Sequence, residues 1–147
     1  MATEALQFVS ILLCALTLVP GGAHALELPN KIHLSAEEYA TVQKLYRGWA
    51  LSGVLVIAAL LSTLGLALAL RDQDGYMAAV IAFLGIAGTQ AIFWSVTYPV
   101  NSATRNWTVL PKNWQQLRVR WEYSHAASAL LNLSALVASI VAVLQAS

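Results

Sequence analysis

Residues 48–70 read GWALSGVLVIAALLSTLGLALAL, an apolar run that contains no Asp, Glu, Lys, Arg or His. A helix needs roughly 20 apolar residues to cross the hydrocarbon core of a bilayer, so this run is long enough to span a membrane. Three further runs, residues 5–23, 75–104 and 126–147, are also apolar and free of charged residues. Together they predict an all-α protein with four transmembrane helices.

The composition agrees with a membrane location. Only 10% of the residues are charged and 59% are hydrophobic, whereas a soluble domain carries about 25% charged residues. We therefore expect the lipid bilayer as the main partner and a single integral membrane domain over residues 1–147. The net charge of +1 argues against nucleic acid as a partner, because phosphate binding relies on clustered Lys and Arg.

The first apolar run ends in Ala23-His24-Ala25, which also fits the cleavage site of a signal peptide. Signal peptides open with Lys or Arg, but the only early charge here is Glu4. Small and polar residues recur at three- and four-residue intervals: Gln7, Ser10, Cys14, Thr17, Gly21 and His24. This spacing places them on one helical face, so we expect a retained helix whose polar face meets protein, with cleavage as the alternative.

Helix boundaries follow from capping residues and prolines. Ser35 and Glu38 form a capping box that starts a helix, Pro99 ends one, and Pro111 suits a first helical turn. The expected helices are residues 5–28, 35–70, 76–98 and 111–145. Short connections make them an antiparallel bundle, and the second and fourth helices extend beyond the membrane on one side. Both large connections are rich in Lys and Arg, which would place them in the cytoplasm.

Candidate site residues gather where the helices reach that end. His24 and Glu27 lie just before the first helix exits, and Glu122 and His125 lie just after the fourth enters. Residues three apart share a helix face, so each pair aims an imidazole and a carboxylate in one direction. Ionisable groups inside a membrane usually face the bundle interior, which predicts one shared pocket. Further polar and aromatic candidates for its lining are Arg47, Gln90, Trp94, Tyr98, Asn101, Arg118 and Trp121.

Other interpretations fit the same residues. The charges could pair at the headgroup boundary with the tryptophans as an interfacial belt, as in a membrane scaffold or partner subunit. His24, Glu27, Glu122 and His125 could hold a single metal ion; a di-iron site would also need a Glu from each of the other two helices. Two histidines at matched depth could instead clamp a haem. The sequence leaves these possibilities open, together with a site that holds no cofactor.

Several runs resemble a known bacterial family of four-helix membrane proteins, which is related to the anthrone oxygenases of polyketide pathways. The runs are residues 24–31 (HALELPNK), 46–49 (YRGW), 98–101 (YPVN), 106–107 (NW), 117–118 (LR) and 121–125 (WEYSH). The resemblance covers nearly the whole chain and implies a four-helix fold in a bacterial inner membrane. It also implies oxidation of a tricyclic phenolic carbon to a quinone by molecular oxygen without a bound cofactor, with Arg118, Trp121 and His125 as active-site candidates.

On this hypothesis His125 is the general base that removes an activated proton, and Glu122 tunes its proton affinity. Arg118 or Arg47 steadies the developing oxyanion. Trp94 and Trp121 flank a small, flat, hydrophobic aromatic substrate. Within this resemblance, the pair of His24 and Glu27 looks like a feature of the bacterial branch and not of the anthrone oxygenases themselves.

Overall fold

The computed structural model describes residues 2–146, and within that range the chain is helical and contains no strand. Four helices are long and apolar enough to cross a membrane, over Thr3–Lys31, Trp49–Ala69, Tyr76–Ala103 and Trp114–Gln145. These confirm the prediction of an all-α membrane protein with four apolar helices. The elements in order are α1 (Ala2–Lys31), α2 (Ala36–Gln43), η1 (Lys44–Tyr46), η2 (Trp49–Leu51), α3 (Ser52–Ala69), α4 (Tyr76–Ile92), the π-helical η3 (Phe93–Thr97), α5 (Tyr98–Ala103) and α6 (Trp114–Gln145).

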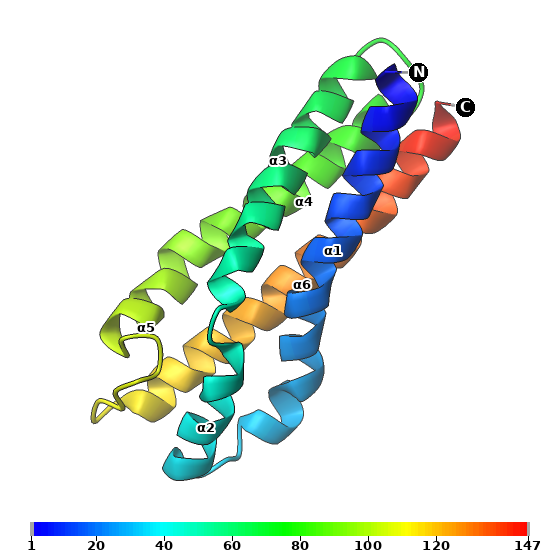
Figure 1. The fold of residues 1–147 in the computed structure, drawn as a ribbon. Coiled ribbons are helices and arrows are strands. Elements are labelled where there is room, and N and C mark those ends of the chain that lie inside the picture. The colour runs from blue at the N-terminus through cyan, green and yellow to red at the C-terminus, as the bar shows by residue number, and fades with distance from the viewer. Residues whose placement is uncertain (1, 147) are drawn as a thin grey trace.

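The four long helices lie side by side, and α2 and α5 lie at the end opposite the two termini (Figure 1). Helix α6 packs against both α1 and α4, and α3 packs against the same two helices from the other side. Small residues allow this close approach. A Cβ placed on Gly85 of α4 would lie 3.0 Å from the Cβ of Ala135 on α6. Close contact between small residues is a common way for helices to associate in lipid, where the hydrophobic effect does not drive them together.

The polar face predicted for the first helix does meet protein. Ser10, Cys14, Thr17 and His24 are all buried, and the Cys14 Sγ lies 3.6 Å from the Ser139 Oγ on α6. The matching face of α6 is buried at Arg118, Glu122, Asn132 and Ser139. Helices α1 and α6 therefore meet along their polar faces, while large apolar side chains point outward.

The prediction of one unbroken helix over residues 35–70 was wrong. The capping box of Ser35 and Glu38 is present and starts α2, but α2 ends at Gln43 and α3 begins only at Ser52. Between them Arg47 is extended and Gly48 takes a left-handed conformation with φ of 89°. Glycine adopts this conformation without a Cβ penalty, so the chain can bend here between α2 and α3.

Three helix ends also differ from the sequence prediction. Helix α1 continues through Pro29 to Lys31. The third span runs past Tyr98 to Ala103, because a π-helical turn precedes Pro99, and a proline in the first turn of α5 loses no hydrogen bond. Helix α6 starts at Trp114 instead of Pro111. The predicted loop of residues 99–110 is accordingly shorter, since residues 99–103 are helical.

A substitution at Gly75, in the turn between α3 and α4, tests how tightly this turn packs against α6. It has φ of 89°, and a Cβ there would lie 2.3 Å from the Ala142 carbonyl oxygen. We predict that Gly75→Ala lowers the free energy of unfolding in detergent by at least about 1 kcal/mol, from the positive φ alone. The matched control is Gly22→Ala, where the new Cβ meets no atom within 4 Å. This helical substitution should leave stability unchanged or raise it by up to about 1 kcal/mol. Equal effects from the two variants would contradict the prediction.

Candidate functional site

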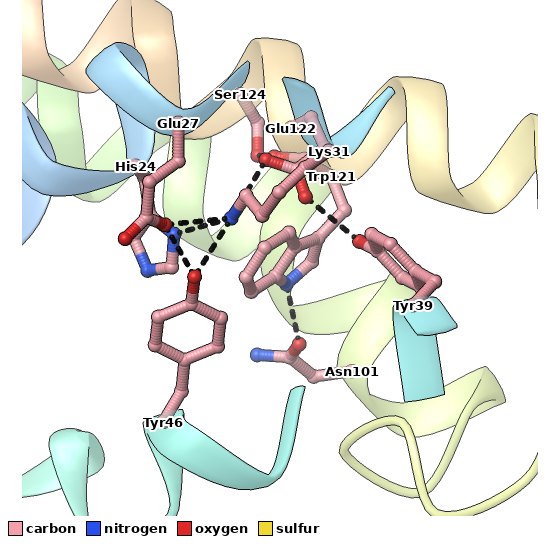
Figure 2. A network of polar contacts seen from close by, with 9 residues as sticks. All are labelled: His24, Glu27, Lys31, Tyr39, Tyr46, Asn101, Trp121, Glu122 and Ser124. Carbon is pink, nitrogen blue, oxygen red and sulfur yellow. Dashed lines mark hydrogen bonds and ion pairs between the residues drawn. The ribbon is translucent and has the colours of Figure 1, made fainter. Parts of the chain in front are cut away.

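Lys31, the last residue of α1, lies at the centre of a buried polar network. Its side chain is only 4% exposed. The Nζ atom lies 3.1 Å from the His24 Nδ1 and 3.1 Å from the Tyr46 hydroxyl. It also lies 3.3 Å from a Glu27 carboxylate oxygen and 3.2 Å from one of Glu122. Figure 2 shows these groups converging on the ammonium from α1, η1 and α6.

The hydrogen bonds in this network fix the proton positions of two groups. A lysine ammonium can only donate, so the His24 Nδ1 accepts, and the neutral His24 ring carries its proton on Nε2. The Tyr46 hydroxyl accepts from Lys31 and donates to Glu27. The His24 imidazole on α1 and the Tyr46 hydroxyl on η1 therefore each have a defined direction of hydrogen bonding.

Glu122 is fully buried on α6 and makes two strong contacts. The Tyr39 hydroxyl of α2 donates to one of its oxygens at 2.9 Å, and Lys31 forms the ion pair with the other. A buried charge is tolerated only when it is paired and hydrogen-bonded. Glu122 thus ties α1 and α2 to α6 at this end of the bundle.

Aromatic rings enclose the two imidazoles. The centroids of His24 and His125 lie 4.3 Å apart, and Trp121 lies 4.9 Å from His24 and 4.3 Å from His125. Tyr46 and Trp49 close the other side of His24, at 4.5 and 5.6 Å. The His125 Nε2 is buried and has no hydrogen-bond partner among the described residues. A buried imidazole nitrogen with no partner inside an aromatic enclosure can accept or release a proton of a bound molecule.

Five of the residues predicted from sequence are brought together here: His24, Glu27, Trp121, Glu122 and His125. Two more lie at its edge. The Arg118 Nη1 donates to the Leu34 carbonyl oxygen at 2.6 Å, and the Asn101 side-chain oxygen accepts from the Trp121 Nε1 at 2.8 Å. Glu122 was expected to tune the proton affinity of His125. The structure shows no contact between them, because Tyr39 and Lys31 engage the two oxygens of Glu122.

Four predicted lining residues are not part of this enclosure. Trp94 and Tyr98 are 61% and 50% exposed and pack with Phe93 on the outside of the bundle. The π-helical turn explains this, because its extra residue rotates Trp94 away from the buried Thr97. Arg47 is exposed at the turn before Gly48, and Gln90 is half-buried on α4.

The structure does not assemble the predicted metal and haem sites. In residues 2–146 no group of three or more His, Cys, Asp or Glu side chains could hold a metal ion. The reason is the Lys31 ammonium, which occupies the position between His24, Glu27 and Glu122 where a cation would bind. A haem clamped by His24 and His125 would need its macrocycle between the rings, and a centroid separation of 4.3 Å leaves no space for it.

Lys31 is the residue that sequence reasoning missed. It was counted only as a basic residue of a connection, because the first helix was expected to end before Pro29. Two spacings could have revealed it, since Glu27 and Lys31 are four apart and His24 and Lys31 are seven apart, which places all three on one helical face. The contacts of Tyr39 with Glu122 and of Tyr46 with Glu27 depend on the break in the helix at Gly48.

The fold and this buried network together define a helical integral membrane protein with an ionisable site near one end of its bundle. In comparisons with protein-family models, with curated proteins and with solved structures, no match to the chain was found.

The two network tyrosines lie outside the membrane-spanning segments, and both are harder to ionise than a free phenol. Burial raises the pKa of Tyr39, and the neighbouring charge of Glu122 adds to this. Burial likewise raises the pKa of Tyr46, together with its hydrogen bond to Glu27. For both tyrosines the folded pKa exceeds the unfolded value of about 10. Their contribution to the free energy of unfolding is therefore fully present below about pH 10 and is lost as the pH rises further.

We predict that Tyr39 and Tyr46 remain protonated in the native protein at about pH 11, where an unfolded tyrosine is mostly ionised. Denaturation at that pH should therefore produce a stepwise rise in phenolate absorbance, because the two phenols ionise on unfolding. Tyr39→Phe and Tyr46→Phe should each reduce the step by one tyrosine. An unchanged step in either variant would show that this phenol is already ionised in the folded protein.

Removing the central ammonium should be costly. Lys31→Met leaves the buried Glu122 carboxylate without its ion pair, so we predict a loss of about 3–5 kcal/mol of unfolding free energy in detergent. The double variant Lys31→Met with Glu122→Gln removes both charges and should recover much of that loss. Lys44→Met, at an exposed lysine outside the network, is the matched control and should change stability little. A loss as large in the control, or no recovery in the double variant, would contradict the role given to the ion pair.

Proposed function

We propose that the chain is an oxidoreductase of the bacterial membrane-protein family related to anthrone oxygenases, and that it oxidises a small hydrophobic aromatic molecule with molecular oxygen. The observation that carries this proposal is the His125 Nε2, which is buried without a partner beside Trp121 and His24. In the tautomer that carries its proton on Nδ1, this nitrogen has a free lone pair for general-base catalysis. The flat rings around it suit a flat aromatic substrate.

The proposed reaction uses this nitrogen as its base. His125 removes a proton from the activated CH2 carbon opposite a ring ketone, and the resulting carbanion is delocalised onto the ketone oxygen. Molecular oxygen adds at that carbon, and the hydroperoxide loses water with a proton returned by His125. The CH2 group and O2 become a C=O group and H2O, so no further oxidant is required.

The surrounding network supports His125. Lys31 fixes His24 in the tautomer with the proton on Nε2, so the ring that faces His125 has a defined orientation. The ion pairs of Lys31 hold the ends of α1 and α6 together, and Trp121 is held by Asn101. A catalytic group must be held within a fraction of an ångström of its working position, which a hydrogen-bonded shell of this kind provides.

In this proposal the helices form an antiparallel bundle in a bacterial inner membrane, and the segment of residues 36–46 and the start of α6 extend beyond one membrane face. The substrate reaches the site from the lipid. The outer side of α3 carries an apolar hollow lined by Ala50, Gly53, Val54, Ile57, Ala58 and Leu61, where such a molecule could rest. Ala50 follows Trp49 in the chain, and the Trp49 ring lies 5.6 Å from that of His24.

Oxygen consumption tests the proposal. Purified protein in mild detergent should consume one O2 per anthrone and form anthraquinone, at a rate above the spontaneous oxidation in protein-free micelles. His125→Gln should lower the protein-dependent rate at least about 100-fold, the usual contribution of a general base. His33→Gln is the control, because His33 is exposed and outside the network. If His125→Gln oxidises anthrone as fast as the control, the proposed function is wrong, and a scaffold or partner-subunit role becomes the better explanation.

A further inference from the structure

Four large aromatic side chains are exposed on the outside of the bundle: Trp49 on η2, Trp94 on η3, Tyr98 on α5 and Tyr123 on α6. Their exposed fractions run from 38% for Trp49 to 61% for Trp94. Tryptophan and tyrosine are enriched where the hydrocarbon core meets the lipid headgroups, because each side chain joins an apolar ring to a polar tip. The four residues mark that boundary only when they share one depth along the bundle.

Contacts between the helices place the two tyrosines at one depth. The hydroxyl oxygens of Thr97 and Ser124 lie 2.9 Å apart and join the third span to α6. Tyr98 follows Thr97 in the chain, and Tyr123 precedes Ser124. The Trp94 ring lies against that of Tyr98, with their centroids 5.2 Å apart. These three exposed rings therefore lie near the level of the Thr97–Ser124 contact.

Trp49 belongs to the same level on the other side of the bundle. Its ring centroid lies 5.6 Å from that of His24, and the His24 ring lies 4.3 Å from that of His125. His125 is the residue after Ser124. A chain of short contacts thus connects Trp49 to the level of the exposed tyrosines, and the aromatic rings surround the bundle at the depth of the imidazole pair.

Exposed charges at the two ends of the bundle have opposite sign. The end that carries α2 and α5 (Figure 1) has more exposed bases than acids in the described chain, namely Lys44, Arg47, Arg105, Lys112 and Arg120 against Glu37 and Glu38. The end that carries the termini has Arg71 against Glu4, Asp72 and Asp74. Within residues 2–146 none of the five exposed bases at the first end forms an ion pair. That end therefore presents uncompensated positive charge beyond the aromatic level.

The segment of residues 44–51, which contains η1 and η2, combines both features. Lys44 and Arg47 are exposed, and the apolar side chains of Leu45 and Leu51 are 72% and 77% exposed. Trp49 lies between them in the chain at the aromatic level. Bases together with exposed Leu and Trp are typical of a segment that lies in the plane of a membrane interface, where the apolar groups enter the acyl region. A negatively charged lipid surface attracts each Lys or Arg that lies close to it.

We propose that this segment binds the headgroups of anionic phospholipids through Lys44 and Arg47. Both side chains are exposed and free of carboxylate partners within the described chain, so a lipid phosphate meets no competing acid there. The Arg47 guanidinium can donate two parallel hydrogen bonds to a phosphate, and the Lys44 ammonium adds a point charge beside it. Trp49 lies at the boundary between those headgroups and the acyl chains.

The lipid contact lies directly beside the buried network. Arg47 follows Tyr46, whose hydroxyl donates to Glu27 and accepts from Lys31. A headgroup on Arg47 is therefore one residue away from the hydrogen bonds of the ammonium. This inference does not depend on the proposed oxidation, because it uses only exposed residues outside the aromatic enclosure.

Quenching of tryptophan fluorescence by brominated lipids tests the proposal. Full-length Trp94→Phe protein is placed in vesicles of equal parts phosphatidylcholine and phosphatidylglycerol, and bromine is carried by the upper acyl chain of either one lipid or the other. Trp49 is then the most exposed tryptophan, since Trp107 and Trp121 are buried and Trp114 is half-buried. Quenching by brominated phosphatidylglycerol should exceed quenching by brominated phosphatidylcholine. Arg47→Gln and Lys44→Gln in this background should each lower that preference about two- to fivefold, the attraction of one base to an anionic surface.

Two matched variants separate a local contact from a general charge effect. Arg47→Lys keeps the positive charge and should retain most of the preference for phosphatidylglycerol. Arg71→Gln removes a base at the opposite end of the bundle and should leave the preference unchanged.

Three results would overturn the proposal. Equal quenching by the two lipids in the parent protein would show a boundary without preference for anionic headgroups. A preference that survives both Arg47→Gln and Lys44→Gln, or that falls as far in Arg71→Gln, would show that this segment is not its source. No quenching of Trp49 by either lipid would show that protein, such as a second copy of the chain, covers the segment instead.

Discussion

The ion pair between Lys31 and Glu122 holds together the end of the bundle where α1 ends and α6 begins. Each charge alone would be costly in apolar surroundings, so each needs the other and further hydrogen-bond partners. Lys31 takes His24, Glu27 and Tyr46 as those partners, and Glu122 takes Tyr39. One ammonium thereby fixes the register of α1 against α6 and the position of the segment that precedes α3.

The break at Gly48 lets Tyr39 and Tyr46 reach the network. A straight helix from Ser35 to Leu70 would carry Tyr39 and Tyr46 away from the bundle along its axis. The left-handed glycine turns the chain instead, so that both phenols reach back to carboxylates of α1 and α6. Two hydroxyl-to-carboxylate hydrogen bonds therefore join the segment that precedes α3 to α1 and α6.

Several parts of the site were predictable from spacing. The pairs of His24 with Glu27 and of Glu122 with His125 place their side chains on single helical faces, and the structure brings those faces together. Trp94 and Tyr98 were not predictable in this way, because a π-helical turn over Phe93–Thr97 changes the face on which they lie. Lys31 was missed for a similar reason, since Pro29 suggested a helix end that the chain does not have.

The number of membrane-spanning helices and their polar faces could be derived from sequence, because hydrophobicity and the 3.6-residue period are local properties of the chain. The identity of the group at the centre of the site could not. A cation among two carboxylates and an imidazole could equally have been a metal ion, and the folded chain supplies the Lys31 ammonium in its place. Which charges end up buried together depends on contacts between residues more than 80 positions apart, such as Tyr39 with Glu122, and no local pattern encodes such contacts.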